Sequence, residues 1–487
     1  MKKILAFDYG ASSGRAIAGY FDGSSLRLEE LHRFDNEPLR MAGVFYWDFP
    51  RLYAEMLGGL SKAARTGEFD SVGIDTWGVD FGLLDARGQL LSNPVHYRDG
   101  GTAGAQQEIF GLIPRERLYE ITGTQFLDFN SIFRLHSLRK LRPEMLSAAE
   151  RLLFMPDLFG YFLTGEKYSE YSIATTSQLM DIRAGTWSEE IFEKTGLPRG
   201  LFGEIVPSGA VVGQLTDDVR AATGANAMKV VAVCGHDTQS AITAVPTDSE
   251  SFAFLSSGTW SLLGTELKKP APTKEALAAN FTNEGGWQGD IGMLKNICGL
   301  WLIQESRRQY AREGTKYSYA ELEQAARSVK PFERFIDPDD ALFVAPGNMP
   351  EKIREYCRRT KQSEPETVGE VIRCIYDSLA FKYRATIESL QAVTGKTFEK
   401  LYIVGGGTKD TFLNGLCASA LDMPVSAGPA EATVVGNLLV QLMSAGEISS
   451  LREARALVAA MPDIRTYEPQ EPGEFAAAYD RFLAATR

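Results

Sequence analysis

The residues KVVAVCGHDTQSAI (229–242) and FAFLSSGTWSLLG (252–264) form two neighbouring strand-and-turn segments at the middle of the chain. In each segment a run of apolar residues of strand length, rich in β-branched or aromatic side chains, stops abruptly at small polar residues. Loops at strand ends are where α/β proteins keep their binding and catalytic groups. The two segments therefore predict an α/β fold whose chemistry lies near Gly235–Thr238 and Ser256–Thr259.

Similar strand-and-turn segments occur in both halves of the chain. Strands are predicted at residues 3–8, 16–21, 26–34, 70–75, 81–84, 230–233, 252–255 and 401–404, helices at 50–65, 103–110, 132–141, 157–163, 299–312, 319–328, 368–394, 411–421 and 432–445, and a loop at 198–212. The first three strands follow one another through glycine-rich turns, which predicts a β-meander. Each half opens with a β-rich segment and closes with helices, and 487 residues exceed one compact core. We therefore expect two related α/β domains with a cleft between them, at residues 1–245 and 246–487.

The charge and the amino terminus exclude several classes of protein. The net charge is −12, from 51 basic and 63 acidic residues, which argues against a broad nucleic-acid-binding surface. The amino-terminal apolar run ends at Asp8, which is too early for a signal peptide, and no run of about 18 apolar residues follows. The five cysteines include no C-x-x-C pair that would suggest zinc. We expect a cytoplasmic protein with no membrane or nucleic-acid partner, either a monomer or a small homo-oligomer.

The stretch DYGASSGR (8–15) offers a first binding turn. Backbone N–H groups and small hydroxyls in such a turn can hold phosphate oxygens, Arg15 adds a cation, and Asp8 can hold magnesium through water. The alternative is an ordinary hairpin turn that needs glycine for its backbone conformation.

The same stretch also matches the G-x-S-x-G elbow of serine hydrolases, with Ser12 as nucleophile. That elbow needs a helix after the serine, whereas residues 15–21 are predicted to be a strand. Only His236, of four histidines, lies in a loop of catalytic character. A serine hydrolase remains the alternative from a different class of enzyme.

Two further turns have catalytic or binding character. Asp237 follows a strand beside Gly235 and Thr238, which suits a carboxylate that takes a proton from a hydroxyl group; the alternative is a helix N-cap. Gly405–Gly407 can approach a nucleotide closely, or can simply form a tight strand-to-helix turn. The triplet lacks the third glycine of a dinucleotide fingerprint, and Gly395-Lys396-Thr397 lacks the first glycine of a P-loop.

Taken in order, these turns resemble those of the FGGY carbohydrate kinases of the actin-like ATPase superfamily, and most closely those of the members that phosphorylate rhamnulose. The resemblance covers nearly the whole chain. Its motifs are DYGASSGR (8–15), IDTWGVDF (74–81), QFLDFN (125–130), MPDLFGYFLTGE (155–166), GHDT (235–238), LSSGTWSL (255–262), NEGG (283–286), LKNICGLWLIQ (294–304) and IVGGGTKDTFLNGLCA (403–418). It implies two actin-like, ribonuclease H-like ATPase domains with a cleft between them.

The resemblance also implies a role for individual residues. Asp237 matches the family's proton acceptor. The positions that match ATP contacts are Ala11, Ser12, Ser13, Gly14, Arg15, Thr259, Gln304 and Gly406, and those that match ketose contacts are Gly78, His236, Asp237, Thr238 and Asn296. The implied reaction transfers the γ-phosphoryl group of magnesium-ATP to the 1-hydroxyl of L-rhamnulose, in rhamnose catabolism.

The resemblance leaves some alternatives open. Gly100-Gly101 replaces the Ser-Arg that commonly follows Tyr97-Arg98-Asp99, so another ketose such as L-fuculose or L-xylulose is an alternative substrate. A sugar sensor or a chaperone-like ATPase on the same fold is a third class, which Asp237 argues against. The resemblance also suggests a disulfide between Cys357 and Cys374, against the reducing cytoplasm.

Overall fold

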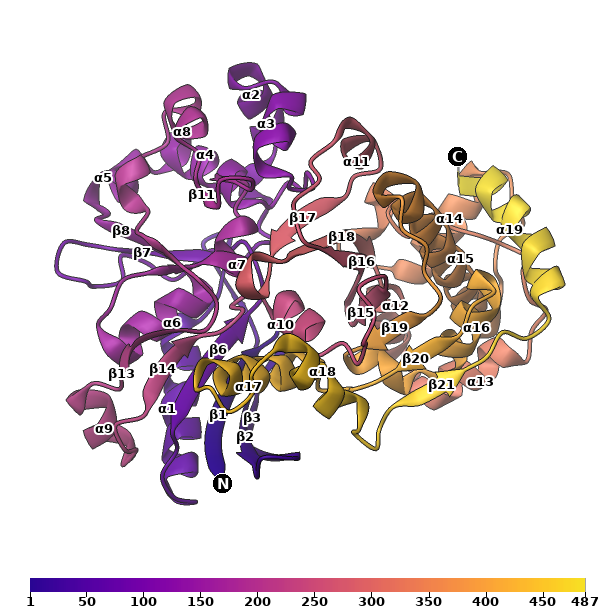
Figure 1. Ribbon diagram of the computed structural model, residues 1–487. Helices are drawn as coiled ribbons and strands as arrows, with labels where there is room; N and C mark the ends of the chain where they lie inside the picture. Colours follow the sequence, from indigo (N-terminus) through magenta and orange to yellow (C-terminus); the bar gives the residue numbers. More distant parts are fainter. Residues whose placement is uncertain (487) are drawn as a thin grey trace. The chain divides into compact units, whose positions relative to one another are not determined.

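The structure is a computed structural model that describes residues 1–486. The chain folds into two compact units (Figure 1). The first unit contains Met1–Asp248, Glu266–Met293 and Ala432–Ala460, and the second contains Ser249–Thr265, Leu294–Glu431 and Met461–Arg487. The predicted boundary between residues 245 and 246 stays a prediction, because each unit is built from separate stretches of chain.

A twisted mixed sheet forms the centre of the first unit. Its strand order is β13-β14-β6-β1-β2-β3, where β1 is Lys2–Tyr9, β2 Ser13–Phe21, β3 Leu26–Asp35, β6 Ser71–Thr76, β13 Ala210–Gln214 and β14 Lys229–Ala232. The first three strands pair antiparallel, which confirms the predicted meander. β6 runs parallel to both β1 and β14, so the carboxyl ends of these three strands lie at the same edge of the sheet.

Helices bury the apolar faces of this sheet. In α1 (Phe49–Ala64) the residues Leu52, Met56, Leu60 and Ala63 recur at helical spacing and are buried, as the periodicity predicts. α6 (Met155–Thr164) packs against β6 and β14, while α17 (Ala432–Ser444) packs against β1 and β6. The large core so formed includes Phe7, Tyr9 and Trp47, all fully buried.

A second core in the first unit surrounds the antiparallel pair of β7 (Phe81–Leu84) and β8 (Arg151–Phe154). Short elements surround it: α2 (Ala105–Leu112), α3 (Arg115–Thr122), α4 (Ser131–Leu141), α5 (Pro143–Ala148), α7 (Tyr171–Thr175), α8 (Glu189–Thr195), β9 (Ser169–Glu170), β10 (Met180–Asp181), β11 (Thr186–Trp187) and β12 (Ile205–Val206). The loop predicted at 198–212 is partly wrong, because β12 pairs with β9 and β13 begins at Ala210. Strands of two residues carry too little periodicity to be recognised in a sequence.

The remaining elements of the first unit are mostly short. They are β4 (Leu39–Met41), β5 (Val44–Tyr46), η1 (Gly100–Thr102), α9 (Asp217–Thr223), α10 (Asp237–Thr243), α11 (Lys274–Ala278), β17 (Thr282–Gly285), η3 (Trp287–Gly289) and α18 (Leu451–Ala459).

The sheet of the second unit repeats the plan of the first. Six neighbouring strands of this sheet follow the order β18-β16-β15-β19-β20-β21, with β15 at Ala253–Ser257, β16 Trp260–Leu267, β18 Ile291–Cys298, β19 Leu401–Val404, β20 Val425–Ala427 and β21 Arg465–Tyr467. β15 pairs antiparallel with β16 and parallel with β19, just as β1 pairs with β2 and β6. The duplication expected from the sequence is therefore one of strand topology.

Helices of the second unit pack around α15 (Val368–Thr394), which was predicted at the same bounds. A capping box between Thr367 and Glu370 starts α15, and Gly395, at φ 68°, ends it. The others are α12 (Trp301–Arg312), α13 (Tyr319–Arg327), η4 (Ala341–Phe343), α14 (Met349–Arg359), η5 (Gly406–Lys409), α16 (Thr411–Leu421) and α19 (Pro472–Thr486).

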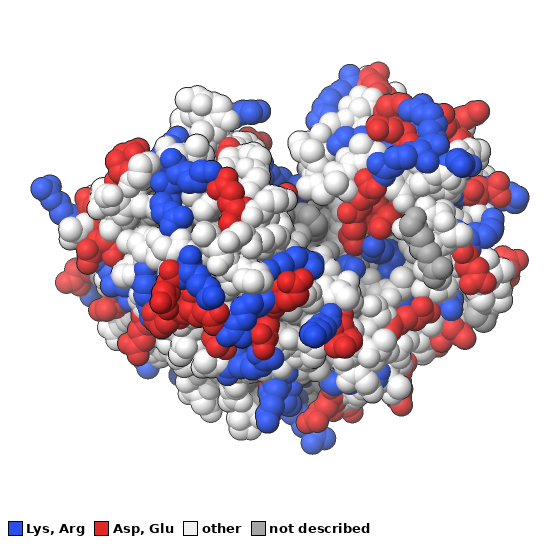
Figure 2. All heavy atoms as spheres, turned by 90° about the horizontal axis from the view of Figure 1, so that it is seen from above, with Lys and Arg blue, Asp and Glu red and all other residues white. Residues whose placement is uncertain are grey.

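On the face of the molecule drawn in Figure 2, acidic and basic side chains are intermixed. This distribution accords with a net charge of −12 that comes from large numbers of both signs. Among residues 1–486, no helix has both the length and the apolar character needed to cross a membrane.

Candidate active site

The turn between β1 and β2 is a tight hairpin whose backbone is hydrogen-bonded by a residue outside the turn. The N–H of Gly10 donates to the carbonyl of Ser13 (2.9 Å), which closes the turn. Asn36 receives no role from the sequence, yet its side chain donates to the carbonyl of Gly10 (2.9 Å) and its N–H to that of Ser12 (3.1 Å). Ser12 itself is exposed at the tip. The stretch is thus a hairpin turn with an exposed tip, and its role in binding phosphate stays a prediction.

Gly14 and Ser12 do not have the structural setting of the G-x-S-x-G turn of a serine hydrolase. A Cβ on Gly14 would lie 2.2 Å from the ring of Phe34, so packing requires a glycine there. Ser12 is followed by strand β2 instead of a helix. The serine-hydrolase alternative is therefore wrong on the geometry that it needs.

Asp8 and Arg15 face each other across β1 and β2. They are register partners, and the Nε and Nη2 atoms of Arg15 donate to Oδ2 of Asp8 at 2.9 and 2.7 Å. The sequence predicts that Arg15 binds phosphate and that Asp8 holds magnesium. In this structure the two side chains bind each other, and no group of three or more metal-ligating side chains gathers within residues 1–486.

Asp75 lies beside Asp8 and was missed in the sequence. It is the register partner of Asp8 on the parallel strand β6 and is fully buried. Asn437 of α17 donates to its Oδ2 (2.6 Å), while Oδ1 has no hydrogen-bond partner among the described residues. Burial and the neighbouring Asp8 carboxylate raise the pKa of Asp75 well above its ordinary value. The sequence did offer a signal for this residue, because an acidic side chain is unusual in a strand whose other residues predict burial.

Three hydrogen bonds hold the backbone of the turn that leads from β14 into α10. The N–H of Gly235 donates to Oε2 of Glu170 (3.0 Å), and the N–H of His236 donates to Oγ of Ser172 (3.2 Å). The carbonyl of Gly235 accepts from the N–H of Thr76 at the end of β6 (2.9 Å). His236 is the N-cap residue of α10, and Asp237 is the first residue of the helix. The alternative interpretation of Asp237 as the N-cap is therefore wrong.

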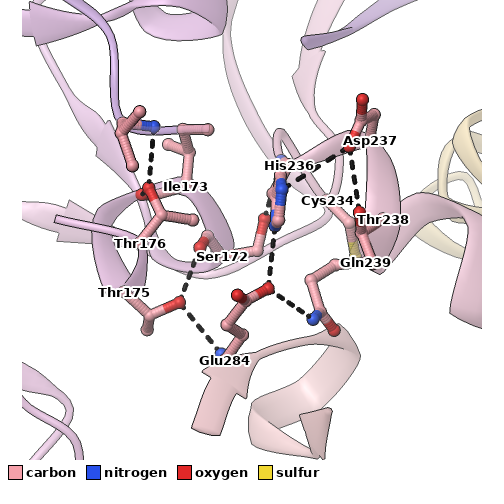
Figure 3. Close-up of polar contacts among 12 residues, drawn as sticks. Ser172, Ile173, Thr175, Thr176, Cys234, His236, Asp237, Thr238, Gln239 and Glu284 are labelled. Atoms are coloured by element: carbon pink, nitrogen blue, oxygen red, sulfur yellow. Dashed lines mark hydrogen bonds and ion pairs between the residues drawn. The ribbon is translucent and has the colours of Figure 1, made fainter. Parts of the chain in front are cut away.

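The side chains of this turn form a polar cluster (Figure 3). Nδ1 of His236 lies 2.9 Å from Oε2 of Glu284, and Nε2 lies 3.5 Å from Oδ1 of Asp237. The hydroxyl of Thr238 donates to the same Oδ1 (3.1 Å). Asp237 keeps 32% of its side chain exposed, whereas His236 keeps 10%. The cluster thus has one accessible carboxylate, backed by a buried imidazole.

The pKa of Asp237 is raised above its ordinary value. Burial raises it most, the imidazole of His236 opposes this, and the carboxylate of Asp8 adds to it. A carboxylate with a raised pKa and partial exposure suits a group that accepts a proton during a reaction.

Gly78 lies beside this cluster; its predicted role in binding substrate stays a prediction. A Cβ on Gly78 would lie 3.3 Å from Thr176 and 3.4 Å from Nε2 of His236. The next residue, Val79, has a φ of 64° and donates its N–H to the hydroxyl of Thr176 (3.1 Å). Thus Gly78 and His236–Thr238 lie together in the first unit. Asn296, the remaining predicted ketose contact, lies on β18 in the second unit.

In the second unit, two of the predicted nucleotide contacts touch each other. The hydroxyl of Thr259 donates to Oε1 of Gln304 on α12 (3.3 Å). The N–H groups of Leu300 and Trp301 donate to the carbonyls of Gly258 and Thr259, both at 3.1 Å. These bonds hold the β15–β16 turn against the start of α12.

The glycine triplet lies at the carboxyl end of β19. Gly405 has a φ of 84°, and a Cβ on Gly407 would lie 2.0 Å from Oγ of Ser257, so these two glycines are needed for the turn itself. Gly406 has nothing within 4 Å of the place where a Cβ would be. Only Gly406 therefore has open space beside it, in keeping with the predicted approach of a nucleotide.

The suggested disulfide is not present. Cys357 and Cys374 are both free and buried. Their mutual interaction lowers the pKa of Cys357 and raises that of Cys374, which burial raises further. The two cysteines are neighbours, as suspected, but they are held as thiols.

Comparison with known proteins assigns both parts of the chain to one family description. Residues 3–244 match the model of the N-terminal domain of the FGGY family of carbohydrate kinases, and residues 253–445 match that of its C-terminal domain.

Curated relatives match over the full length. The chain is 44% identical over 487 residues to a rhamnulokinase from Bacteroides thetaiotaomicron, covering 100% of both chains. It is 40% identical to a rhamnulokinase from Oceanobacillus iheyensis, covering 95% of this chain and 97% of the relative. Among solved structures, a ligand-bound xylulose kinase from Lactobacillus acidophilus superposes with a TM-score of 0.82 at 14% identity, covering 99% and 97% of the two chains. That structural similarity confirms the expected fold class.

Proposed function

Because the chain belongs to the FGGY family of carbohydrate kinases, we propose that it transfers the γ-phosphoryl group of ATP to the 1-hydroxyl of L-rhamnulose. The products are ADP and L-rhamnulose 1-phosphate. Support for this ketose comes from curated rhamnulokinases that are 44% and 40% identical over nearly the whole chain. L-fuculose and L-xylulose are the competing substrates, because Gly100 and Gly101 depart from the usual sequence beside Arg98-Asp99.

The observation that carries the proposed chemistry is the setting of Asp237. It stands at the first turn of α10 with its side chain partly exposed, beside His236, Thr238 and Gly78. We assign Asp237 as the base that takes the proton of the attacking hydroxyl, and Gly78, His236, Thr238 and Asn296 as the ketose contacts. Phosphoryl transfer depends mainly on positioning and on neutralising charge, so a single well-placed carboxylate is enough for the proton.

ATP binding is assigned to two sets of residues. The turn residues Ala11, Ser12, Ser13, Gly14 and Arg15 are assigned to the phosphates. Residues 11–13, of which Ser12 is exposed and its neighbours half-buried, suit phosphate oxygens, and Thr259, Gln304 and the open side of Gly406 suit the rest of the nucleotide. Asp8 binds Nε and Nη2 of Arg15, so the remaining N–H groups of the guanidinium suit a phosphate oxygen.

Magnesium fits the residues at the β1 edge. Asp8 and the unpartnered Oδ1 of Asp75 are oxygen donors, the class that this ion prefers, and Asp8 would hold it through water. When bound, the ion neutralises charge on the phosphates.

Cytoplasmic location is part of the proposal. ATP-dependent catabolism belongs where ATP is made, and the free thiols of Cys357 and Cys374 accord with a reducing compartment.

The test is an ADP-release assay with magnesium-ATP and a panel of L-rhamnulose, L-fuculose, L-xylulose, D-xylulose, L-ribulose and glycerol. We expect kcat/KM to be highest for L-rhamnulose. Strong activity on another member with a flat response to L-rhamnulose would overturn the substrate while leaving the kinase assignment intact. No phosphorylation of any sugar would overturn both.

A further inference from the structure

Glu284 is a buried carboxylate to which the proposed reaction gives no role. It lies on β17 and is 4% exposed. Its Oε2 atom lies 2.9 Å from Nδ1 of His236 and accepts a hydrogen bond from Nε2 of Gln239 on α10 (3.2 Å). Figure 3 shows Glu284 pointing at the imidazole from the side opposite Asp237. Since buried charges persist only with partners, its position calls for an explanation.

The strand that carries Glu284 is fixed on both sides of it. The N–H of Asn283 donates to the carbonyl of Gly123 (2.8 Å), and the N–H of Gly285 donates to the hydroxyl of Thr175 (3.0 Å). A Cβ on Gly285 would lie 2.2 Å from the ring of Tyr171, so this strand packs against α7 without room for a side chain. The carboxylate is therefore presented to His236 by a rigid support.

The imidazole of His236 lies between two carboxylates. Its Nδ1 atom is 2.9 Å from Oε2 of Glu284, and its Nε2 atom, on the other side of the ring, is 3.5 Å from Oδ1 of Asp237. We propose that Glu284 is a positioning residue for phosphoryl transfer, which fixes the ring of His236 between two carboxylates and holds its Nε2 toward Asp237. This inference rests on the proposed role of Asp237 and goes beyond it.

The charges around the ring favour its protonated form. The titratable groups that act on His236 are Glu284 from β17, Asp237 from α10 and Glu170 from β9. Burial opposes the charged form, but these three carboxylates outweigh it, and the pKa of His236 is raised above its ordinary value.

The ring of His236 acts in turn on Asp237. Burial and the carboxylate of Asp8 raise the pKa of Asp237, and His236 lowers it; Asp75 of β6 is a further acidic neighbour. By holding the ring in this position, Glu284 favours the ionised form of Asp237, which is the form that accepts the proton of the sugar hydroxyl.

The experiment compares Glu284→Gln with Asp290→Asn. The glutamine keeps the size of the side chain and an accepting oxygen but removes the charge. Asp290 lies six residues further along, pairs with Lys268 at 2.8 Å and contacts none of the cluster, so its variant is the matched control. Two quantities are measured: the pH dependence of kcat/KM for the sugar, and the titration of the His236 ring by NMR. With only four histidines, the His236 signal is assigned from its loss in His236→Asn.

We expect Glu284→Gln to lower the pKa of His236 and to move the acidic limb of kcat/KM to higher pH by about one unit, as one lost charge interaction would do. The limb moves to higher pH because losing the charge of Glu284 raises the pKa of Asp237. The base works only when deprotonated, so a higher pH is then needed for activity. Asp290→Asn should leave both quantities unchanged. A merely structural role would reduce the amount of active protein without moving the limb.

An unchanged limb together with an unchanged His236 titration would overturn the proposal. If Glu284→Gln does not fold, the NMR titration of the wild-type protein still tests the proposal. A pKa of the His236 ring below about 6.5, the ordinary value for histidine, would overturn the proposal. The NMR titration needs no substrate, so its outcome is separate from the choice of L-rhamnulose as the sugar.

Discussion

Gly436 of α17 lies directly against the carbonyl of Ser240 in α10, so that a Cβ on Gly436 would be 1.7 Å from that oxygen. Backbone therefore packs on backbone at this crossing, and α10 is the helix that begins at Asp237. No side chain other than hydrogen fits, because a carbonyl oxygen in a helix has no freedom to move aside. The position of the proposed base thus depends on a glycine about 200 residues later in the chain.

Gly436→Ala should destabilise the protein by about 1–3 kcal/mol, the usual cost of overpacking, and should lower kcat because α10 must move. Urea unfolding and steady-state kinetics measure the two effects. Gly415→Ala is the control, since Gly415 is also helical but has nothing within 4 Å of its Cβ position. That control should be neutral or stabilising by about 0.5 kcal/mol. Equal stability of the two variants would contradict the packing argument.

Asp237→Asn should lower kcat by about 10²–10⁴-fold, because the amide cannot accept the proton of the sugar hydroxyl. ATP affinity, measured by calorimetry, should stay largely intact, since the assigned nucleotide contacts lie elsewhere. Asp248→Asn, at an exposed residue outside the cluster, serves as the control. A near-normal rate in Asp237→Asn would show that another group is the base.

The wild-type pH profile should reveal the same carboxylate. Burial holds the pKa of Asp237 above its ordinary value, despite the opposing charge of His236. The base is competent only when deprotonated, so kcat/KM should fall as the pH falls through this raised pKa, above the value of about 3.9 for an ordinary aspartate. The residual activity of Asp237→Asn should lack this limb. A limb that persists in the variant must be assigned to a different group.

Gln304→Ala should raise the KM for ATP more than it lowers kcat, because the lost contact is made in both the ground state and the transition state. The variant also removes the acceptor of the Thr259 hydroxyl, which loosens the turn after β15. Gln309→Ala is the matched control on the same helix, where the side chain bonds only to groups on the helix surface. An ATP KM that does not change would argue against a nucleotide contact.

Glu170→Gln should destabilise the fold by about 3 kcal/mol, measured by urea unfolding. The carboxylate accepts hydrogen bonds from the N–H groups of Ser172, Ile173 and Gly235 and from the hydroxyls of Ser172 and Ser208. A carboxamide has only one accepting oxygen, so buried donors lose their partners. Glu189→Gln, whose side chain is 74% exposed, should change stability by less than about 0.5 kcal/mol. Similar stabilities for both variants would mean that this network contributes little.

Much of the candidate site was predictable because it lies in local sequence. Asp237 was recognisable as a carboxylate just after a strand, and Gly405–Gly407 as a strand-end turn, from a few neighbouring residues. The order of such turns then indicated the family. The bounds of α15 were likewise readable, since a long periodic segment with a cap at each end is a local property.

The buried partners were not predictable in this way. The hydrogen-bonded residues lie far apart in the sequence: Glu170 and Gly235 are 65 residues apart, Glu284 and Gln239 are 45 apart, and Asn437 and Asp75 are 362 apart. Glu284 lies in the NEGG motif (283–286), but that motif gave no sign that its carboxylate meets His236. The pairing of Arg15 with Asp8 also depends on strand register, which periodicity does not provide.

The sequence by itself thus determined some of the local segments of this protein: the strands that lead into the candidate site, where they stop, and which small polar residues follow. The strands β16 and β18 were not predicted. Periodicity, turn chemistry and motif order depend only on near neighbours, so they can be read from the chain. The tertiary structure alone decided which carboxylate meets which cation, that His236 lies between Asp237 and Glu284, and that Gly436 supports α10. These relationships arise from strand pairing and burial between distant segments. In a packed interior, an unpaired charge or a side chain that is slightly too large destabilises the fold by more than the local conformational preferences of a few residues can offset.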